Sequence, residues 1–315
     1  MKVVLTDQVF PTVTVERRIL GSIGAELEIL EDSSADSIAA GARDAEALLT
    51  TYAPIGADLM GSLEKCRIIS RYGIGVDNID LDAAKSRGIV VTNVPDYCVE
   101  EVADHTIALL LAVTRKVVKG DHVVRSGGWG IAELREVHRL RGRTLGLVGF
   151  GHIGRAVGLR ATTFGLSLRV YDPYLSAEAT KGLDVTRDGD LQSLLAAADV
   201  VSIHAPLVAD TKGMFDAPTL GAMKPGAFLL NTSRGPIVAT EALVDALRSG
   251  HLGGAALDVF DTEPPDAALL EGLDNLVATP HSAFYSEEAI EESQTKASEA
   301  IVAVLKGEEP RYRVA

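Results

Sequence analysis

The sequence predicts an α/β protein of two domains, each built around a doubly wound parallel sheet. Short apolar stretches alternate with helical patterns from one end of the chain to the other. A glycine-rich turn near residue 150 connects one of these apolar stretches to a helical pattern. With 315 residues, the chain also exceeds the length at which a single hydrophobic core usually stops growing. Two domains are therefore expected.

The first part of the chain reads as one α/β unit. Its apolar stretches are short, and the helical stretches between them supply the crossovers that parallel strands require. We predict strands near residues 2–6, 26–30, 47–50, 68–70 and 90–93, with helices around 13–24, 36–42, 58–66 and 82–87.

A long helical pattern from residue 99 to residue 125 is predicted to be one helix that crosses to the next domain. The run Gly127-Gly128-Trp129-Gly130 breaks the pattern. The charged stretch 133–143 that follows is expected to form a surface arm.

The second α/β unit runs from residue 144 to about residue 284, and a Glu- and Ala-rich helix over 286–306 is expected to cross back. Its further strands are predicted near 200–204, 227–231, 255–259 and 276–279. We therefore expect a domain of residues 98–285 inserted into a domain of residues 1–97 and 286–315, with a cleft between them.

A nucleotide-binding motif opens the second unit. The apolar strand 145–148 runs into a Gly-x-Gly-x-x-Gly turn, and a helix over 153–164 follows. Gly149 permits the tight turn, Gly151 lets the backbone approach a pyrophosphate, and Gly154 lets the helix pack closely on the strand. The unpaired N–H groups at the helix N-terminus favour that negative charge. The motif predicts dinucleotide binding.

Asp172 follows the next strand, 167–171, about 20 residues after the turn. A carboxylate there accepts hydrogen bonds from the hydroxyls of the adenosine ribose and repels a 2′-phosphate. Pro173 and Tyr174 come next, so no arginine stands beside it to hold such a phosphate. The pattern favours NAD over NADP. The alternative is that Asp172 only caps the turn before Pro173.

Composition excludes several classes of function. The net charge of −14 argues against nucleic acid as a partner. The longest apolar run, 107–113, is far too short to span a bilayer. The start of the chain reads as a first strand and not as a signal peptide. Cys66 and Cys98 lack metal-ligand spacing and indicate a reducing compartment, so a cytoplasmic protein without a metal is expected.

Polar residues follow three successive strands of the second unit, where parallel sheets place their ligand sites. A hydride-transfer enzyme acting on a 2-keto acid needs a cation for the substrate, a proton donor, and a partner that orients the donor. Arg234 suits the first role through its planar fork. His281 suits the second, since histidine titrates near neutrality. Glu263 suits the third, because a nearby carboxylate favours imidazolium.

Each of these residues has a plainer interpretation. Arg234 would be a surface helix residue, Glu263 a solvated acid before two prolines, and His281 a hydrogen-bonded structural histidine.

His105 lies one helical turn after Glu101, but without a third ligand in the sequence it is interpreted as a packed helix histidine rather than a metal ligand.

Over essentially its whole length the chain resembles the D-isomer-specific 2-hydroxyacid dehydrogenase family. The resemblance is carried by residues 72–80 (YGIGVDNID), 149–154, 231–235 (NTSRG), 254–260 (GAALDVF) and Pro280-His281. It implies a Rossmann NAD-binding domain inserted into a flavodoxin-like substrate domain. It also implies NAD as cofactor, a D-2-hydroxy acid and its 2-keto acid as the reaction pair, and a homodimer.

The resemblance also assigns individual positions. The catalytic residues would be Arg234, Glu263 and His281. The pyrophosphate would lie at Gly151, His152, Ile153 and Gly154, and the ribose at Asp172. Ala205, Pro206 and Thr211 would line the cofactor, with Thr232 and Asp258 near the nicotinamide. The amides of Ile74 and Gly75 would hold the substrate carboxylate.

Within the family, the chain is most similar to the branch of the C-terminal-binding-protein corepressors, through Arg71, residues 171–176 and residues 281–287. By this resemblance Phe284 would stand beside the substrate, at the position where the corepressors have tryptophan. Arg71 suggests a substrate with a further anionic or polar group, or alternatively a salt bridge to a surface acid. The branch raises a second function, an NAD(H)-sensing scaffold for protein partners with weak dehydrogenase activity. A formate-type enzyme is disfavoured, because that branch has glutamine at the position of Glu263.

Overall fold

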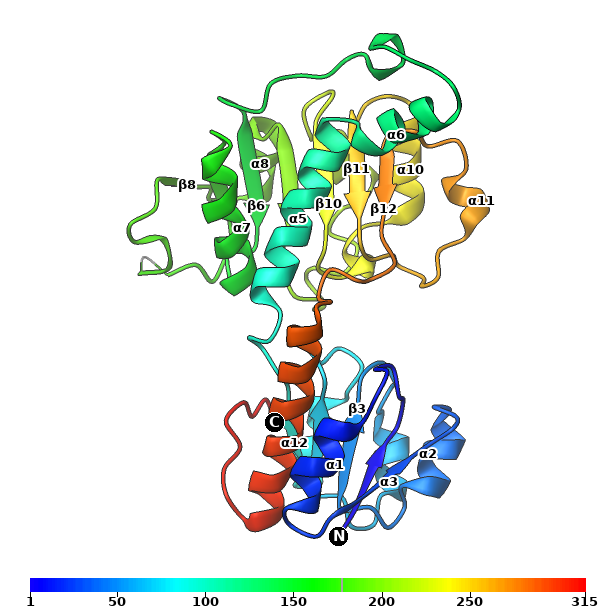
Figure 1. Ribbon diagram of the computed structural model, residues 1–315. Helices are drawn as coiled ribbons and strands as arrows, with labels where there is room; N and C mark the ends of the chain where they lie inside the picture. The colour runs from blue at the N-terminus through cyan, green and yellow to red at the C-terminus, as the bar shows by residue number, and fades with distance from the viewer. Residues whose placement is uncertain (177) are drawn as a thin grey trace. The chain divides into compact units, whose positions relative to one another are not determined.

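The computed structural model describes residues 1–176 and 178–315, and the chain divides into two compact units. One unit consists of Met1–Cys98 and Ser286–Ala315 and contains a five-stranded sheet. The other consists of Val99–Tyr285 and contains a seven-stranded sheet (Figure 1). We refer to them as the five-stranded unit and the seven-stranded unit. The predicted class, two parallel-sheet α/β domains, is confirmed.

The five-stranded sheet has the order β2-β1-β3-β4-β5, and every strand pair is parallel. This is the flavodoxin-like doubly wound order. The strands are β1 (Lys2–Leu5), β2 (Glu26–Ile29), β3 (Ala47–Thr50), β4 (Ile68–Arg71) and β5 (Val90–Thr92). The helices are α1 (Thr14–Gly21), α2 (Ala35–Gly41), α3 (Ala57–Ser62), α4 (Leu81–Ser86) and α12 (Glu287–Lys306).

The seven-stranded sheet has the order β12-β11-β10-β9-β6-β7-β8 and is also parallel throughout. Counted from β6, this is the dinucleotide-binding order 3-2-1-4-5-6 with one strand added at the far edge. The strands are β6 (Thr144–Val148), β7 (Ser167–Tyr171), β8 (Val185–Arg187), β9 (Val200–Ile203), β10 (Phe228–Asn231), β11 (Gly254–Leu257) and β12 (Leu276–Ala278).

Helices cover both faces of this sheet, which explains why its central strands are apolar on both sides. Side chains of α5 and α7 form one hydrophobic cluster with the sheet, and those of α8 and α10 form the other (Figure 1). The helical elements are α5 (Val99–Thr114), α6 (Val117–Arg125), α7 (His152–Thr163), α8 (Leu191–Ala197), α9 (Ala217–Gly221), α10 (Thr240–Arg248) and α11 (Ala267–Leu270), with short 3₁₀ turns η1 (Ala132–Leu134), η2 (Glu178–Thr180) and η3 (Gly235–Ile237).

The single long helix predicted over 99–125 is wrong. The structure has two helices, α5 and α6, separated by Arg115 and Lys116, and Lys116 adopts a left-handed backbone with φ 53°. The apolar residues of α6 do not face a core: Val117, Val118 and Val124 are all more than half exposed. Helical spacing alone could not reveal the break, because the spacing of apolar residues continues across it. One continuous helix would also need its apolar residues to be buried, and those of α6 are not. No helix in the described part of the chain is long and apolar enough to cross a membrane.

Candidate active site

The glycine-rich turn joins β6 to α7 through two very close backbone approaches. A Cβ atom on Gly149, which has φ 89°, would lie 2.7 Å from the carbonyl carbon of His204. A Cβ atom on Gly154 would lie 2.5 Å from the carbonyl oxygen of Gly149. Neither backbone can move aside, so only glycine fits. The first turn of α7, from the exposed His152 onward, therefore starts directly at the sheet edge and presents its unpaired amides there.

Asp172 follows β7 beside this turn and is already part of the protein's hydrogen-bond network. One carboxylate oxygen accepts from the amide of Phe150 at 2.9 Å, and the other accepts from the amide of Tyr174 at 2.9 Å. Asp172 therefore does cap the following turn, as the plainer interpretation required. Each oxygen of a carboxylate has a second lone pair, so the same side chain can still accept hydrogen bonds from a pair of ribose hydroxyls.

The loop after β9 contacts the glycine turn, and hydrogen bonds of its own residues hold it in place. Thr211 Oγ1 donates to the carbonyl of Pro206 at 2.6 Å and accepts from the amide of Val208 at 2.9 Å. His204 is half-buried with its Nε2 2.9 Å from the hydroxyl of Ser202, and burial lowers its pKa to about 3, which keeps the ring neutral. Ala205 is buried and Pro206 is exposed, in a loop whose backbone at His204 and Ala205 contacts Gly149.

His281 and Glu263 come from neighbouring strand ends and form a hydrogen-bonded pair. His281 Nδ1 lies 2.8 Å from Glu263 Oε2. The second oxygen of Glu263 accepts from the amide of Phe260 at 3.0 Å, which fixes the carboxylate. With Nδ1 engaged by the carboxylate, Nε2 becomes the ring atom that would exchange a proton. This is the donor-and-partner arrangement that hydride transfer to a carbonyl requires.

The electrostatics of this pair favour an ionised carboxylate. Partial burial raises the pKa of Glu263, but hydrogen bonds from His281 and from the Phe260 amide outweigh it, and the charges of His281 and Arg234 add to them. The pKa of Glu263 is therefore lowered from its ordinary value of 4.5. The influence of Arg234 on this carboxyl shows that all three residues predicted to be catalytic share one electrostatic environment.

Arg234 stands between β10 and η3, and its loop is pressed against the loop that carries Glu263. Asn231, at the end of β10, donates from its amide to the carbonyl of Arg234 at 2.9 Å and accepts from the amide of Ser233 at 3.1 Å. A Cβ atom on Gly235 would lie 1.7 Å from the carbonyl oxygen of Phe260, so the two loops touch backbone to backbone. Arg234 is half-buried and not a surface helix residue.

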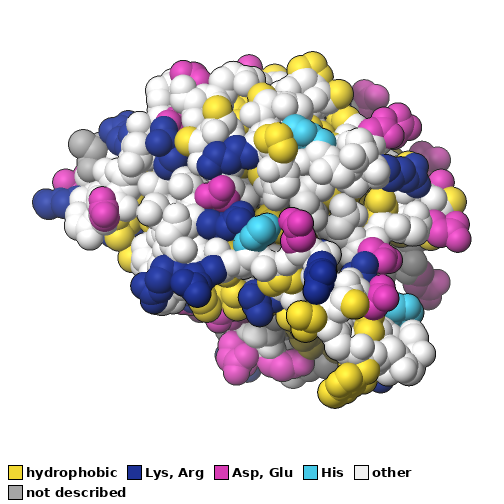
Figure 2. Space-filling view, turned by 90° about the horizontal axis from the view of Figure 1, so that it is seen from above, with side chains coloured by type: hydrophobic (Ala, Val, Ile, Leu, Met, Phe, Trp, Pro, Cys, Tyr) yellow, Lys and Arg dark blue, Asp and Glu magenta, His cyan; other side chains and the backbone are white. Residues whose placement is uncertain are grey.

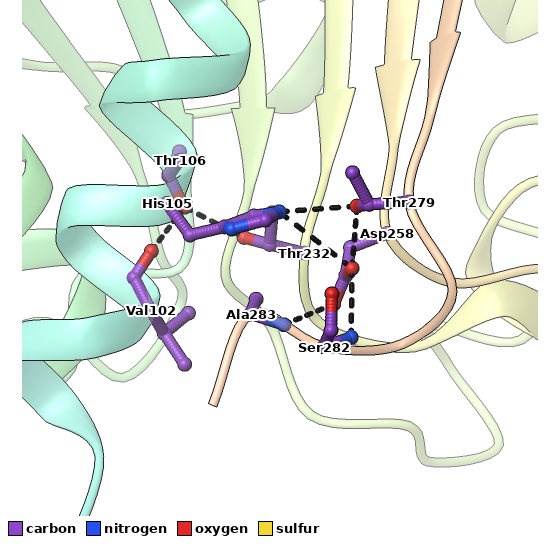
Figure 3. Close-up of polar contacts among 8 residues, drawn as sticks. All are labelled: Val102, His105, Thr106, Thr232, Asp258, Thr279, Ser282 and Ala283. Atoms are coloured by element: carbon purple, nitrogen blue, oxygen red, sulfur yellow. Dashed lines mark hydrogen bonds and ion pairs between the residues drawn. The ribbon is translucent and has the colours of Figure 1, made fainter. Parts of the chain in front are cut away.

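Asp258 organises the loop that ends in His281. Its carboxylate accepts from the hydroxyl of Thr279 at 2.5 Å and from the amides of Ser282 and Ala283, both at 2.9 Å (Figure 3). Its backbone carbonyl accepts from the amide of His281 at 2.8 Å. His281 has φ 52°, a left-handed backbone that a non-glycine residue adopts only when its surroundings hold it there. The ring of Phe284 lies edge-on to the ring of His281, with centroids 6.3 Å apart.

Three of the residues predicted to bind the substrate, Arg71, Ile74 and Gly75, lie in the five-stranded unit. Arg71, at the end of β4, is 8% exposed, and its Nε donates to the carbonyl of Thr51 at 3.1 Å. Ile74 and Gly75 are half-buried in the loop that follows, and Asn93 donates to the carbonyl of Ile74 at 2.7 Å. The structure thus places Arg71, Ile74 and Gly75 at one sheet edge of the five-stranded unit, and Arg234, Glu263, His281 and Phe284 together in the seven-stranded unit.

Sequence reasoning missed several residues that hold these loops. Thr106 on α5 lies 2.8 Å from Thr232, hydroxyl to hydroxyl, and His105 Nε2 lies 3.0 Å from Thr279 Oγ1 (Figure 3). One signal was present: His105 and Thr106 are adjacent polar residues inside an apolar helix. Among the described residues no group of three His, Cys, Asp or Glu side chains could hold a metal ion.

Several known proteins are similar to this chain in sequence and in fold. Residues 107–283 match the family model of the D-isomer specific 2-hydroxyacid dehydrogenase, NAD binding domain. The glyoxylate reductase of Thermofilum pendens is 40% identical over 273 residues, which are 85% of this chain and 80% of that protein. The crystal structure of TT0316 protein from Thermus thermophilus has a TM-score of 0.90 at 40% identity, with both chains covered completely. D-lactate dehydrogenase from Aquifex aeolicus, complexed with NAD and lactic acid, has a TM-score of 0.88 at 27% identity and covers 98% of this chain and 96% of its own.

Proposed function

The chain belongs to the D-isomer-specific 2-hydroxyacid dehydrogenase family and is an NAD-dependent oxidoreductase, and on that premise we propose that Arg234, Glu263 and His281 interconvert a small 2-keto acid and its D-2-hydroxy acid. The observation that carries the proposal is the 2.8 Å contact between His281 and Glu263 at the carboxyl edge of the dinucleotide-binding sheet.

Each residue of the trio has one task. Arg234 holds the substrate carboxylate through its planar fork and polarises the carbonyl at C2. His281 donates a proton from Nε2 to the carbonyl oxygen when the substrate is reduced, and takes it back when the hydroxy acid is oxidised. Glu263 keeps the ring oriented and stabilises its charged form. When bound, the nicotinamide supplies the hydride for C2.

The cofactor residues fit a dinucleotide. We propose that the amides of Gly151, His152, Ile153 and Gly154 hold the pyrophosphate and that Asp172 holds the ribose hydroxyls. The structure supports this assignment because α7 starts at the sheet edge and because the carboxylate of Asp172 retains acceptor capacity. Ala205, Pro206, Thr211, Thr232 and Asp258 would complete the site around the nicotinamide half.

We propose that residues 98–285 bind the cofactor and that residues 1–97 and 286–315 contribute substrate-binding groups. The amides of Ile74 and Gly75 would hold the substrate carboxylate, and Phe284 would form an aromatic wall next to His281. Arg71 is a buried cation at the end of β4, on the same sheet edge as those two amides. A cation at this edge supports a substrate with a further anionic or polar group.

The C-terminal-binding-protein-like branch stays a proposal that rests on the sequence around Arg71, Asp172 and His281. A purely scaffolding role is not favoured, because the relatives compared above are named as a reductase and a dehydrogenase. The paired His281 and Glu263 also have no use in a protein that only senses NAD(H).

We propose that the protein forms a homodimer through the surface around α6. Trp129 is 89% exposed and Ile131 is 72% exposed, and both follow the exposed valines of α6 closely in the sequence. Large apolar side chains exposed within one short segment support an interface there. Light scattering during gel filtration should give twice the chain mass, and Trp129→Glu should shift the protein towards monomer. A wild-type monomer at micromolar concentration would refute this assembly.

We propose a cytoplasmic protein that does not act on nucleic acid. Neither Cys66 nor Cys98 forms a disulfide, which suits a reducing compartment. The net charge of −14 opposes binding to phosphate backbones. On the face shown in Figure 2, basic and acidic side chains are interspersed with hydrophobic ones.

The deciding experiment follows NADH oxidation by the purified protein with glyoxylate, hydroxypyruvate, pyruvate, 2-oxobutyrate and oxaloacetate. We expect turnover on at least one acid and its loss in His281→Ala. Preference for oxaloacetate over pyruvate that disappears in Arg71→Met would support the anionic side group. Tight NADH binding without turnover on any of these acids would contradict the proposed function. It would favour the alternative, an NAD(H)-sensing scaffold for protein partners.

A further inference from the structure

The cluster in Figure 3 contains a histidine that the proposed reaction does not use. His105 lies on α5, and its Nε2 is 3.0 Å from Thr279 Oγ1 and 3.7 Å from Asp258 Oδ1. The side chain of Asp258 is 1% exposed, whereas that of His105 is 25% exposed. His105 therefore reaches from the helix onto an enclosed carboxylate, and it is more than a packed helix histidine.

The hydrogen atoms in this cluster can be placed by elimination. A carboxylate only accepts, so the 2.5 Å contact between Thr279 and Asp258 uses the single hydroxyl hydrogen of Thr279. Thr279 Oγ1 must then be the acceptor from His105, which assigns a hydrogen to Nε2 of that ring. The three residues form a directed chain in which His105 donates to Thr279 and Thr279 donates to Asp258.

The chain ends on the backbone of the catalytic loop. Asp258 receives the amide of His281 on its carbonyl and the amides of Ser282 and Ala283 on its carboxylate. These consecutive amides hold His281 in its left-handed conformation. The carboxylate cannot rotate without releasing Thr279 as well as both loop amides.

The helix that carries His105 is itself anchored at the same turn. Thr106 Oγ1 donates to the carbonyl of Val102 at 2.7 Å, so it must accept from the hydroxyl of Thr232, 2.8 Å away. Thr106 is completely buried, and Thr232 stands two residues before Arg234. Adjacent residues of α5 thus contact the loop that carries Arg234 and the loop that carries His281.

We propose that His105 is a positioning residue for the dehydrogenase reaction, which holds Asp258 through Thr279 and thereby fixes the place of His281. This inference rests on the proposed function, since the position of His281 matters only if it is the proton donor. Small displacements of a reacting group lower turnover steeply, while cofactor binding at the glycine turn is unaffected. The inference therefore assigns to His105 a larger effect on kcat than on NADH affinity, to which Asp258 contributes beside several other residues.

The test compares His105→Leu, which removes the donor at similar volume, with His105→Gln, whose side-chain amide can still donate to Thr279. We expect kcat to fall about tenfold in His105→Leu and to stay within about twofold of the wild type in His105→Gln. The Kd for NADH should change less than kcat in His105→Leu, because Asp258 is only one of several residues proposed to contact the cofactor. The isotope effect on kcat with NADH deuterated at the transferred position should rise in His105→Leu, because the chemical step becomes slower. His251→Gln, at a half-buried histidine between α10 and β11 whose ring contacts the carbonyl of Leu220, is the matched control.

A double-mutant cycle tests the chain itself. Thr279→Val removes the bridging hydroxyl, and combining it with His105→Leu should cost no more than Thr279→Val alone. Additive losses would show that His105 does not act through Thr279 and would overturn the inference. Equal losses in His105→Leu and His105→Gln, or unchanged kcat in both, would also overturn it. An active His281→Ala would overturn the proposed function, whereas an inactive His281→Ala beside a fully active His105→Leu would remove only the role of His105.

Discussion

Asp7 in the five-stranded unit and Asp258 in the seven-stranded unit both hold a loop at the carboxyl edge of a parallel sheet. Asp7, just after β1, accepts from the amides of Thr51, Tyr52 and Ala53 at 2.9, 2.6 and 3.3 Å. Asp258, just after β11, accepts from two loop amides and from Thr279. In both sheets, therefore, an aspartate just after a strand accepts hydrogen bonds from the amides of a loop that is distant in the sequence.

The two loops differ in what they hold. The Asp7 loop carries the carbonyl of Thr51, which accepts from Arg71, and leaves Tyr52 45% exposed. The Asp258 loop carries His281, whose ring is fixed again by Glu263. A surface that only has to be presented to a substrate needs a fixed backbone, whereas proton transfer also needs a fixed ring nitrogen. Substitutions in the seven-stranded unit should therefore affect kcat, and those in the five-stranded unit should affect KM.

The largest effect is expected for His281→Ala. Removal of the proton donor should lower kcat about 10³-fold while NADH binding stays nearly intact. Stopped-flow measurement of NADH oxidation and fluorescence titration of NADH separate the two quantities. His251→Ala, at a half-buried position between α10 and β11, is the control. Normal turnover in His281→Ala would exclude it as the acid.

Arg234→Lys should come next, with a loss of about 10²-fold in kcat/KM for the keto acid. An ammonium keeps the charge but cannot reproduce the two parallel hydrogen bonds of a guanidinium. Steady-state kinetics with a saturating cofactor would measure it, and Arg248→Lys at the end of α10 is a matched control. Near-normal kinetics would remove Arg234 from the mechanism.

Asp172→Ala tests cofactor choice within the seven-stranded unit. We expect the preference for NADH over NADPH, as a ratio of kcat/KM values, to fall about tenfold, because the carboxylate both binds the ribose and repels a 2′-phosphate. Asp184→Ala, at an exposed position beyond β7, is the control. If the ratio does not change, another group reads the ribose.

Asp7→Asn tests the other side of the comparison. The amide nitrogen of asparagine cannot accept from the loop, so part of the loop 51–53 should loosen. We expect KM for the keto acid to rise about threefold, with a smaller change in kcat and no change in the Kd for NADH. A fall in kcat with constant KM would contradict the division of labour between the two units.

The smallest effect is expected in the pH dependence of stability. Because the pKa of Glu263 is lowered in the folded protein, its ionised form stabilises the fold above the ordinary carboxyl pKa of 4.5, and this stabilisation is lost as the pH falls through the lowered pKa. The Tm difference between the wild type and Glu263→Gln should therefore be larger at pH 7 than at pH 3.5. A difference that grows on acidification would contradict the assigned direction.

The glycine turn shows what local sequence can predict. Gly149, Gly151, Gly154 and Asp172 lie within one strand–helix–strand unit, so their spacing along the chain sets their spacing in space. The proximity of Arg234, Glu263 and His281 was also predictable, because each comes after a strand and parallel strands end at one edge of a sheet. The break between α5 and α6 was not, since it depends on what those helices pack against.

The sequence by itself determined the alternation of strands and helices, the order of the motifs and the chemistry of the polar residues after each strand. Only the tertiary structure decided how those residues are held. His105 and Thr279 are 174 positions apart, and Asp7 and Tyr52 are 45 apart. Such contacts depend on the strand registers of whole sheets and on how α5 packs against the seven-stranded sheet. No local pattern records those registers, because burial and packing decide them only when the chain is folded.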